Sequence, residues 1–235
     1  VAVRWDLVPR NVATLIDPPA VSKTRITPLT PSQIKILLQA VAGHRLEALY
    51  TLAVCTGMRQ GEILGLTWAD IDLDTGALHI RRALQNGSFT ELKTERSMRT
   101  LPLAPSVVSA LRAHAIRQKQ EIQWAGVKPT IPDLVFMSTE GTPLDAANLR
   151  RSFSRVLQRA GLPAVRFHDL RHSCASYLLA QGVQPRVIME LLGHSQISLT
   201  MDTYSHVMPV LEREAADVME TLYQHETALS NELRQ

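Results

Sequence analysis

The sequence lacks the features of a membrane or secreted protein. Among its 235 residues no run approaches the ~18 to 20 uninterrupted apolar residues that a membrane helix needs, and the N-terminus lacks the basic and then apolar pattern of a secretory signal. Cysteine is scarce: Cys55 and Cys174 are the only two, and both lie in apolar helical patterns, which predicts buried thiols in a reducing compartment. A hydrophobic content of 45% still provides for a folded core. We therefore expect a soluble, cytoplasmic protein with no membrane partner.

Excess charge is also nearly absent, since the net charge of +3 does not by itself indicate a nucleic-acid-binding protein. The distribution of the charges is more informative. One basic cluster comprises Arg150, Arg151, Arg155, Arg159, Arg166 and Arg171, and a second comprises Arg81, Arg82, Lys93, Arg96 and Arg99. Asp169 is the only carboxylate in 150–171. A single such cation is most simply a solvated surface residue, but two clusters together favour contact with phosphates.

The periodicity of apolar residues predicts a mainly α fold with a small three-stranded antiparallel β-sheet. Helices are expected at 31–43, 45–56, 60–66, 105–126, 146–161, 168–181, 185–192, 198–203 and 209–233. Thr30-Pro31 and Asp145 supply the start signals of two of them. Alternating residues at 70–80, around a glycine-containing turn, and at 98–103 predict the sheet. Residues 1–26 contain prolines and no steady period, which indicates the end of an upstream element and a linker, so that the chain is expected to be a fragment.

Four segments place cations or titratable groups beside turns and helix ends. They are Thr56-Gly57-Met58-Arg59-Gln60-Gly61-Glu62, Leu92-Lys93-Thr94-Glu95-Arg96-Ser97-Met98-Arg99, His168-Asp169-Leu170-Arg171-His172, and Leu192-Gly193-His194-Ser195 followed by Tyr204-Ser205-His206. In order and approximate spacing, the set resembles the tyrosine site-specific recombinases of the phage-integrase type. The resemblance extends over 29–208, and the four segments in sequence are much more specific than any one of them.

The resemblance implies that the chain cleaves DNA with Tyr204 as nucleophile, forming a 3′-phosphotyrosyl intermediate. Attack by a phenol requires stabilisation of the charge on a five-coordinate phosphorus atom and a proton for the departing oxygen. A guanidinium is always charged and presents a planar fork to phosphate oxygens, so Arg59 and Arg171 are expected to clamp the phosphate without a metal or another cofactor. Glu62, three residues after Arg59, and Asp169 are expected to support these cations.

Lys93 and two histidines complete the catalytic set that the resemblance implies. Lys93 would be the general acid for the 5′ oxygen, a task that needs a group able to release a proton. His168 and His194 would hydrogen-bond the phosphate and assist proton movement, and the sequence leaves open which of them is the base. Each of two residues also has a purely structural interpretation: Lys93 as a solvated lysine at the tip of a hairpin, and His194 as the C-terminal cap of a helix. His172 and His206 receive no role.

The same resemblance implies the wider organisation of the protein. Residues 1–26 would be the end of an upstream DNA-binding domain plus a linker, 27–208 the catalytic domain, and 209–235 a helical tail that packs in cis or is exchanged between protomers. The expected DNA-binding residues are Arg81, Arg82, Arg96, Arg99, Arg150, Arg151, Arg155 and Arg166. The expected partners are duplex DNA at a specific site, other protomers in a tetrameric synapse, and accessory DNA-bending or directionality proteins. The setting would be the nucleoid of a bacterial cell, and the outcome integration or excision of a phage or other mobile element.

Three alternatives remain at this point. A type IB topoisomerase-like enzyme would relax DNA by the same chemistry without joining partners, and an inactive homologue would bind DNA only. A zinc hydrolase would use His168 and His172, whose i, i+4 spacing puts two imidazoles on one helical face. Asp169 in place of the usual glutamate, and the cation of Arg171, argue against the zinc site.

Overall fold

The computed structural model of the 235-residue chain describes residues 3–5, 9–10, 28–91 and 98–193. Apart from the short 3-10 helix η1 (Val3–Trp5), the described elements lie between Pro31 and Leu192. Within these ranges no helix is both long enough and apolar enough to cross a bilayer. The predicted helices at 198–203 and 209–233, and most of 1–26, lie outside the described residues, so the proposed domain division remains a prediction.

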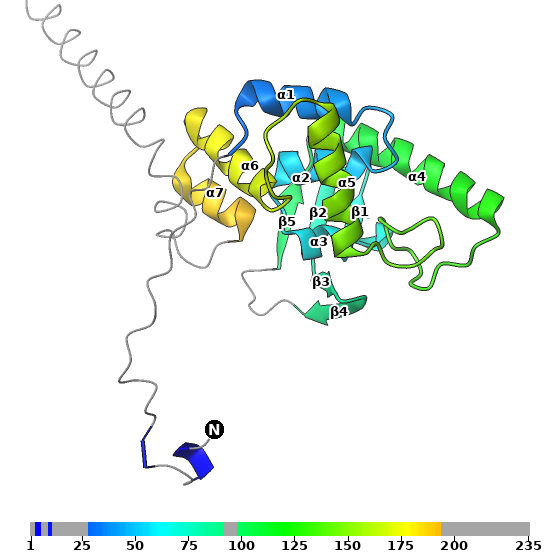
Figure 1. Ribbon diagram of the computed structural model, residues 1–235, viewed down its shortest axis with the longest axis horizontal. Helices are drawn as coiled ribbons and strands as arrows, with labels where there is room; N and C mark the ends of the chain where they lie inside the picture. Colours follow the sequence, from blue (N-terminus) through cyan, green and yellow to red (C-terminus); the bar gives the residue numbers. More distant parts are fainter. Residues whose placement is uncertain (1–2, 6–8, 11–27, 92–97, 194–235) are drawn as a thin grey trace, which may run out of the picture.

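Helix α2 (Glu47–Thr56) forms the centre of the core. Seven of its ten residues are buried, because its sequence is apolar on nearly every face, and it packs against α4 (Pro105–Ala125) and α6 (Asp169–Ala180). Helix α1 (Pro31–Ala40) packs against both α2 and α5 (Ala146–Arg159), and Figure 1 shows it above α2. Tyr50 is fully buried, and its hydroxyl donates to Ser152 Oγ of α5 at 3.0 Å. This packing holds the first and last thirds of the domain together.

The helix limits follow local signals in the sequence. Thr30 caps α1 with Pro31 at its first position, and the Asp145 side chain accepts from the backbone of Asn148 at the start of α5, as predicted. Helix α7 (Pro185–Leu192) begins with a proline and ends at Gly193, which has φ +67°. Helix α3 (Gln60–Leu64) is shorter than the predicted 60–66. The mainly helical fold is therefore confirmed.

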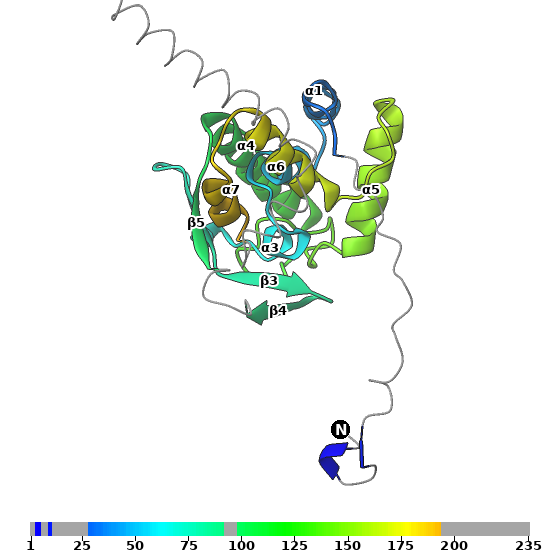
Figure 2. The same ribbon diagram turned by 90° about the vertical axis from the view of Figure 1, so that its left-hand side faces the viewer.

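The predicted three-stranded antiparallel sheet is present. Its order is β1 (Ile71–Asp72), β2 (Ala77–Ile80) and β5 (Arg99–Pro102), with Ile71 opposite Leu78 and Leu78 opposite Leu101. All three of these side chains are buried. Strand β2 thus joins the sheet to the core, and β5 runs beside α7 (Figure 2).

A second sheet was not predicted. Strands β3 (Arg82–Gln85) and β4 (Ser88–Glu91) form an antiparallel hairpin that projects beyond α3 (Figures 1 and 2). Asn86 and Gly87 form its turn with φ +50° and +76°. This Asn-Gly pair is the strongest short hairpin signal in a sequence, and it would have revealed the hairpin. Gly65 lets the hairpin approach, since an added Cβ there would lie 2.9 Å from the backbone nitrogen of Leu84.

Candidate active site

Three arginines from three different elements converge on the C-terminal end of α7. Each donates to one of three consecutive carbonyl oxygens: Arg99 Nε to Leu191 at 2.8 Å, Arg171 Nη2 to Leu192 at 2.7 Å, and Arg59 Nη2 to Gly193 at 3.0 Å. The last carbonyls of a helix have no partner within the helix and carry its negative partial charge, which favours cations there. The fold thereby gathers three positive charges at the end of α7, beside Gly193, which directly precedes His194 in the sequence.

Arg59 occupies the turn between α2 and α3. Gly57 ends α2 with φ +61°, and Arg59 follows in an extended conformation as the N-terminal cap of α3. Its Nη1 donates to Glu62 Oε1 at 2.7 Å, while its backbone N–H donates to Glu62 Oε2 at 2.9 Å. The side chain of Arg59 remains 41% exposed. A rigid turn therefore presents a guanidinium at the surface, anchored by Glu62 as predicted.

Glu62 is a buried carboxylate shared by two guanidiniums. Its side chain is 1% exposed, and it accepts from Arg99 as well as from Arg59. Burial by itself raises its pKa, but the hydrogen bonds and charge of Arg99, followed by the backbone and side-chain hydrogen bonds of Arg59, hold that pKa below the ordinary value. Glu62 therefore remains ionised at neutral pH, and the three arginines with this one carboxylate carry a net charge of +2.

Arg171 lies inside the protein. It is 3% exposed, and its Nη1 donates to the Gly57 carbonyl at 2.8 Å while Nη2 reaches α7. One turn before it, His168 is the exposed N-terminal cap of α6. The buried guanidinium links the turn that presents Arg59 to α7.

Two imidazoles stand at the start of α6. The rings of His168 and His172 are 5.3 Å apart and nearly perpendicular. The pKa of His168 is lowered mainly by desolvation and then by the charge of Arg171. The pKa of His172 is lowered to about 4, mainly by desolvation and then by the neighbouring His168. Both rings are therefore neutral near pH 7, so His168 has a lone pair with which to accept a proton.

The predicted DNA-binding arginines occupy different settings. On α5, Arg150, Arg151 and Arg155 are exposed, together with Arg159. Arg81 and Arg82 reach the buried Asp70 at 3.7 and 3.3 Å. Arg166 is 64% exposed and holds Asp169, whose pKa is lowered by that partner against the effect of burial. Arg99 differs from all of these, since its side chain is only 8% exposed. A buried guanidinium held by a carboxylate does not fit the predicted contact with DNA.

The position of Arg99 could have been anticipated from the sequence. Arg99 and Leu101 are two residues apart on β5 and thus share a face of the strand, and Leu101 is buried. The alternation therefore predicts an inward-facing arginine, for which a carboxylate partner is required.

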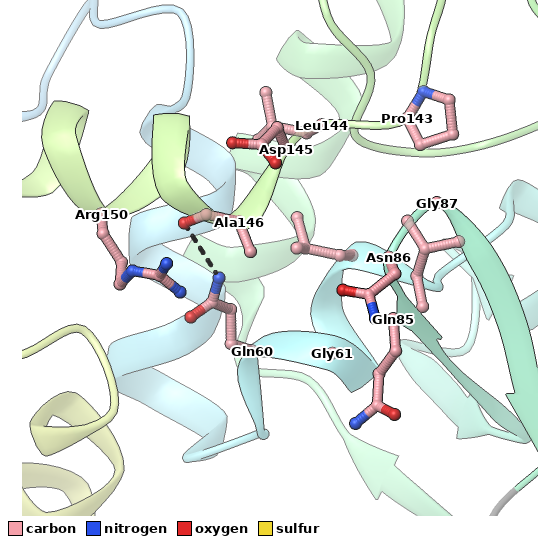
Figure 3. A pocket seen from close by; sticks show the side chains of 12 residues that line it. Gln60, Gly61, Gln85, Asn86, Gly87, Pro143, Leu144, Asp145, Ala146 and Arg150 are labelled. Carbon is pink, nitrogen blue, oxygen red and sulfur yellow. Dashed lines mark hydrogen bonds between the residues drawn. The ribbon is translucent and has the colours of Figure 1, made fainter.

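An open hollow of about 660 Å³, which was not predicted from the sequence, is lined in part by Gln60, the residue after Arg59. It is bounded by α3, the β3–β4 turn and the start of α5. In Figure 3 the side chains of Gln60 and Arg150 lie on one side of it and those of Gln85 and Asn86 on the other. The Gln60 amide donates to the Ala146 carbonyl at 3.3 Å and so ties α3 to α5. Its wall also includes apolar side chains, those of Leu64, Leu84, Pro143 and Leu144, so it is lined by polar and apolar groups alike.

Four predicted site residues, Lys93, Arg96, His194 and Tyr204, lie outside the described residues. Their roles therefore remain predictions. In the described part of the chain no group of three or more histidine, cysteine, aspartate or glutamate residues is arranged to hold a metal ion.

Comparison with known proteins agrees with the geometry. The profile of the phage integrase family matches residues 28–209. A tyrosine recombinase XerC-like protein of Caldanaerobacter subterraneus subsp. tengcongensis is 36% identical over 217 residues, which cover 86% of this chain and 56% of that protein. An integrase of Streptomyces ambofaciens is 34% identical, with 94% of this chain and 60% of that protein covered. The chain thus spans little more than half the length of these relatives.

Solved structures show the same fold. The Tn1549 transposon integrase in complex with a circular intermediate DNA superimposes with a TM-score of 0.70 at 23% identity, over 90% of this chain and 74% of that one. The XerA recombinase superimposes with a TM-score of 0.67 at 21% identity, over 85% of this chain and 66% of that one. With its family profile matched over most of its length, the chain belongs to the phage integrase family.

Proposed function

We propose that the chain is the catalytic part of a site-specific DNA recombinase that cleaves and rejoins strands through Tyr204. The observation that carries this proposal is the convergence of Arg59, Arg99 and Arg171 on the end of α7, with Glu62 between two of them. The net charge of +2 that these groups carry suits a phosphate that gains negative charge during attack. Because Arg59 is the most exposed of the three, at 41%, its guanidinium is the one proposed to contact the phosphate.

The reaction exchanges one phosphoester for another. The Tyr204 oxygen bonds to the phosphorus atom, the bond from phosphorus to the 5′ oxygen breaks, and Lys93 supplies the proton that the 5′ oxygen takes up. The neutral His168 accepts the phenol proton or hydrogen-bonds a phosphate oxygen. A 5′ hydroxyl from a partner strand then attacks the phosphotyrosine and releases Tyr204. Because the number of phosphoester bonds is unchanged, no nucleotide is consumed.

The biological setting follows from the relatives' names and from the surface charge. One solved relative is a transposon integrase bound to a circular intermediate DNA, and we propose integration or excision of a mobile element for this chain. We further propose that the arginines of α5, which are exposed, contact the DNA backbone. The proposed assembly is a tetramer on DNA, with 209–235 exchanged between protomers, and accessory DNA-bending or directionality proteins would set the outcome. The bacterial nucleoid is the proposed location.

Capture of the covalent intermediate tests the proposal. The chain is incubated with a pool of nicked duplexes of random sequence, and adducts that survive denaturation are isolated and sequenced. We expect a DNA–protein bond at Tyr204 that forms equally well with a chelator present and is absent from Tyr204→Phe. An adduct at another residue, or none with the unaltered chain, would contradict the proposal.

A further inference from the structure

Arg99 is the cation of the cluster that contacts both the Glu62 carboxylate and the end of α7 without lying at the surface, since its side chain is 8% exposed. It is the first residue of β5, and its two terminal nitrogens fork onto the two oxygens of Glu62, Nη1 to Oε1 at 3.3 Å and Nη2 to Oε2 at 3.0 Å. Its Nε donates to the Leu191 carbonyl of α7 at 2.8 Å. One planar group therefore spans a carboxylate and a helix end, which a lysine ammonium on a single stem does not reproduce.

The contacts of Arg99 connect it to Arg59 without any direct bond between the two. Each oxygen of Glu62 that accepts from Arg99 also accepts from Arg59, from its side chain at Oε1 and from its backbone at Oε2. On the α7 side, Arg99 lies against Gly193, where an added Cβ would be 2.8 Å from Nη1. The carbonyl of the same glycine accepts from Arg59. Arg99 thus touches both groups that fix the guanidinium of Arg59.

Charge gives Arg99 a second effect. Glu62 has 1% of its side chain exposed, so water screens its charge weakly. If Arg59 were its only partner, the buried carboxylate would cancel the positive charge that Arg59 presents. With Arg99 on the inner side, the three groups have a net charge of +1, which favours the negative charge that the phosphate gains during attack over the charge of the bound ground state.

We propose that Arg99 is a positioning residue for strand cleavage, which fixes Glu62 and the end of α7 so that Arg59 meets the phosphate, and that Arg99 itself makes no DNA contact. The inference rests on the proposed function. It replaces the expectation from the sequence that Arg99 binds DNA. A positioning role and a DNA-contact role for Arg99 predict different effects on DNA binding. Loss of a phosphate contact weakens DNA binding and reduces the slope of log affinity against log salt concentration by about one unit.

The test compares Arg99→Gln and Arg99→Lys with Arg45→Gln as a matched control. Arg45 also joins one glutamate and one backbone carbonyl, those of Glu121 and Met137, away from the cluster. Each variant is assayed for melting temperature, for DNA affinity over a range of salt, and for the single-turnover rate of adduct formation. The probe is a nicked duplex with the sequence recovered from the adducts of the unaltered chain.

We expect Arg99→Gln to bind DNA with unchanged affinity and salt slope but to cleave about 100-fold more slowly, since small displacements of a catalytic group have effects of this size. Arg99→Lys keeps the charge and should recover part of the rate, while Arg45→Gln should cleave at the normal rate. Weakened, less salt-dependent binding by Arg99→Gln would overturn the inference, as would a normal cleavage rate.

A double variant separates positioning from loss of folding. If Arg99 acts through Glu62, Arg99→Gln combined with Glu62→Gln should cleave about as slowly as the slower single variant, because the two share one effect. Losses that multiply would overturn the inference. Absence of any adduct with the unaltered chain would instead refute the proposed function, and the inference with it, so the two failures are distinguishable.

Discussion

Replacement of Glu62 by glutamine tests the arrangement of charges directly. Glu62→Gln preserves the size of the side chain and one carbonyl oxygen, but it removes the negative charge between Arg59 and Arg99. Four hydrogen bonds reach the two carboxylate oxygens, at 2.7, 2.9, 3.0 and 3.3 Å. The amide offers one acceptor in place of two, and its own N–H groups then face the guanidinium of Arg99 or of Arg59.

The expected cost follows from burial. Removing one partner of a buried ion pair typically costs about 3 to 5 kcal/mol, and the retained shape and acceptor place this variant at about 3 kcal/mol. For a chain of this length, 1 kcal/mol corresponds to about 2 to 4 °C, so the melting temperature should fall on the order of 10 °C. Glu121→Gln is the matched control. Glu121 pairs with Arg45 in the same way but is 33% exposed, so its loss should cost at most about 1 kcal/mol.

The assay is thermal unfolding of both variants and the unaltered chain as a function of pH. The pKa of Glu62 lies below its ordinary value of 4.5, so its stabilisation is complete above pH 4.5 and is lost as the pH falls through the lower pKa of the folded state. The difference between Glu62→Gln and the unaltered chain should therefore be constant near neutral pH and shrink in acid. If the two variants melt within about 2 °C of each other at pH 7, the reasoning from burial is refuted.

Three further predictions concern other groups. Burial lowers the pKa of His172 to about 4, so the folded protein resists protonation of this ring. The melting temperature should therefore fall as the pH drops from 6.5 to 4, by an amount equivalent to at most about 3 kcal/mol. A His172→Gln variant whose melting temperature falls equally steeply in acid would contradict this. In chemical denaturation, Gly57→Ala should destabilise the fold by about 1 to 3 kcal/mol more than Gly126→Ala. Both glycines have φ +61°, but only at Gly57 would the added Cβ meet a side chain, at 2.5 Å. Equal losses of stability would show that backbone strain alone matters. Burial raises the pKa of Cys174 to about 12, so this thiol should not react in the folded protein. A thiol reagent at pH 8 should label only the exposed Cys55 in the native chain and both cysteines in denaturant. Labelling of a native Cys55→Ser variant would contradict this.

The sequence determined the limits of most elements, because those limits depend on neighbouring residues alone. Thr30-Pro31 and Asp145 start helices through a cap and a fixed backbone angle, and glycines such as Gly57 and Gly193 end them in left-handed conformations. The three-stranded sheet followed from alternation. The hairpin at Asn86-Gly87 was not predicted, although its turn signal is present in the sequence.

The sequence also determined the family, since four short segments in a fixed order suffice to identify it. The mutual geometry of the predicted site residues was decided by tertiary structure. Residues 59, 99 and 171 are brought to one helix end by hydrogen bonds that span 134, 92 and 21 positions of the chain. Such contacts arise from how α2, α3, α6, α7 and β5 pack, which local backbone preferences do not specify. The motifs therefore identified Arg59 and Arg171 alike, but packing left the first partly exposed, buried the second, and joined Arg99 to Glu62 and the end of α7.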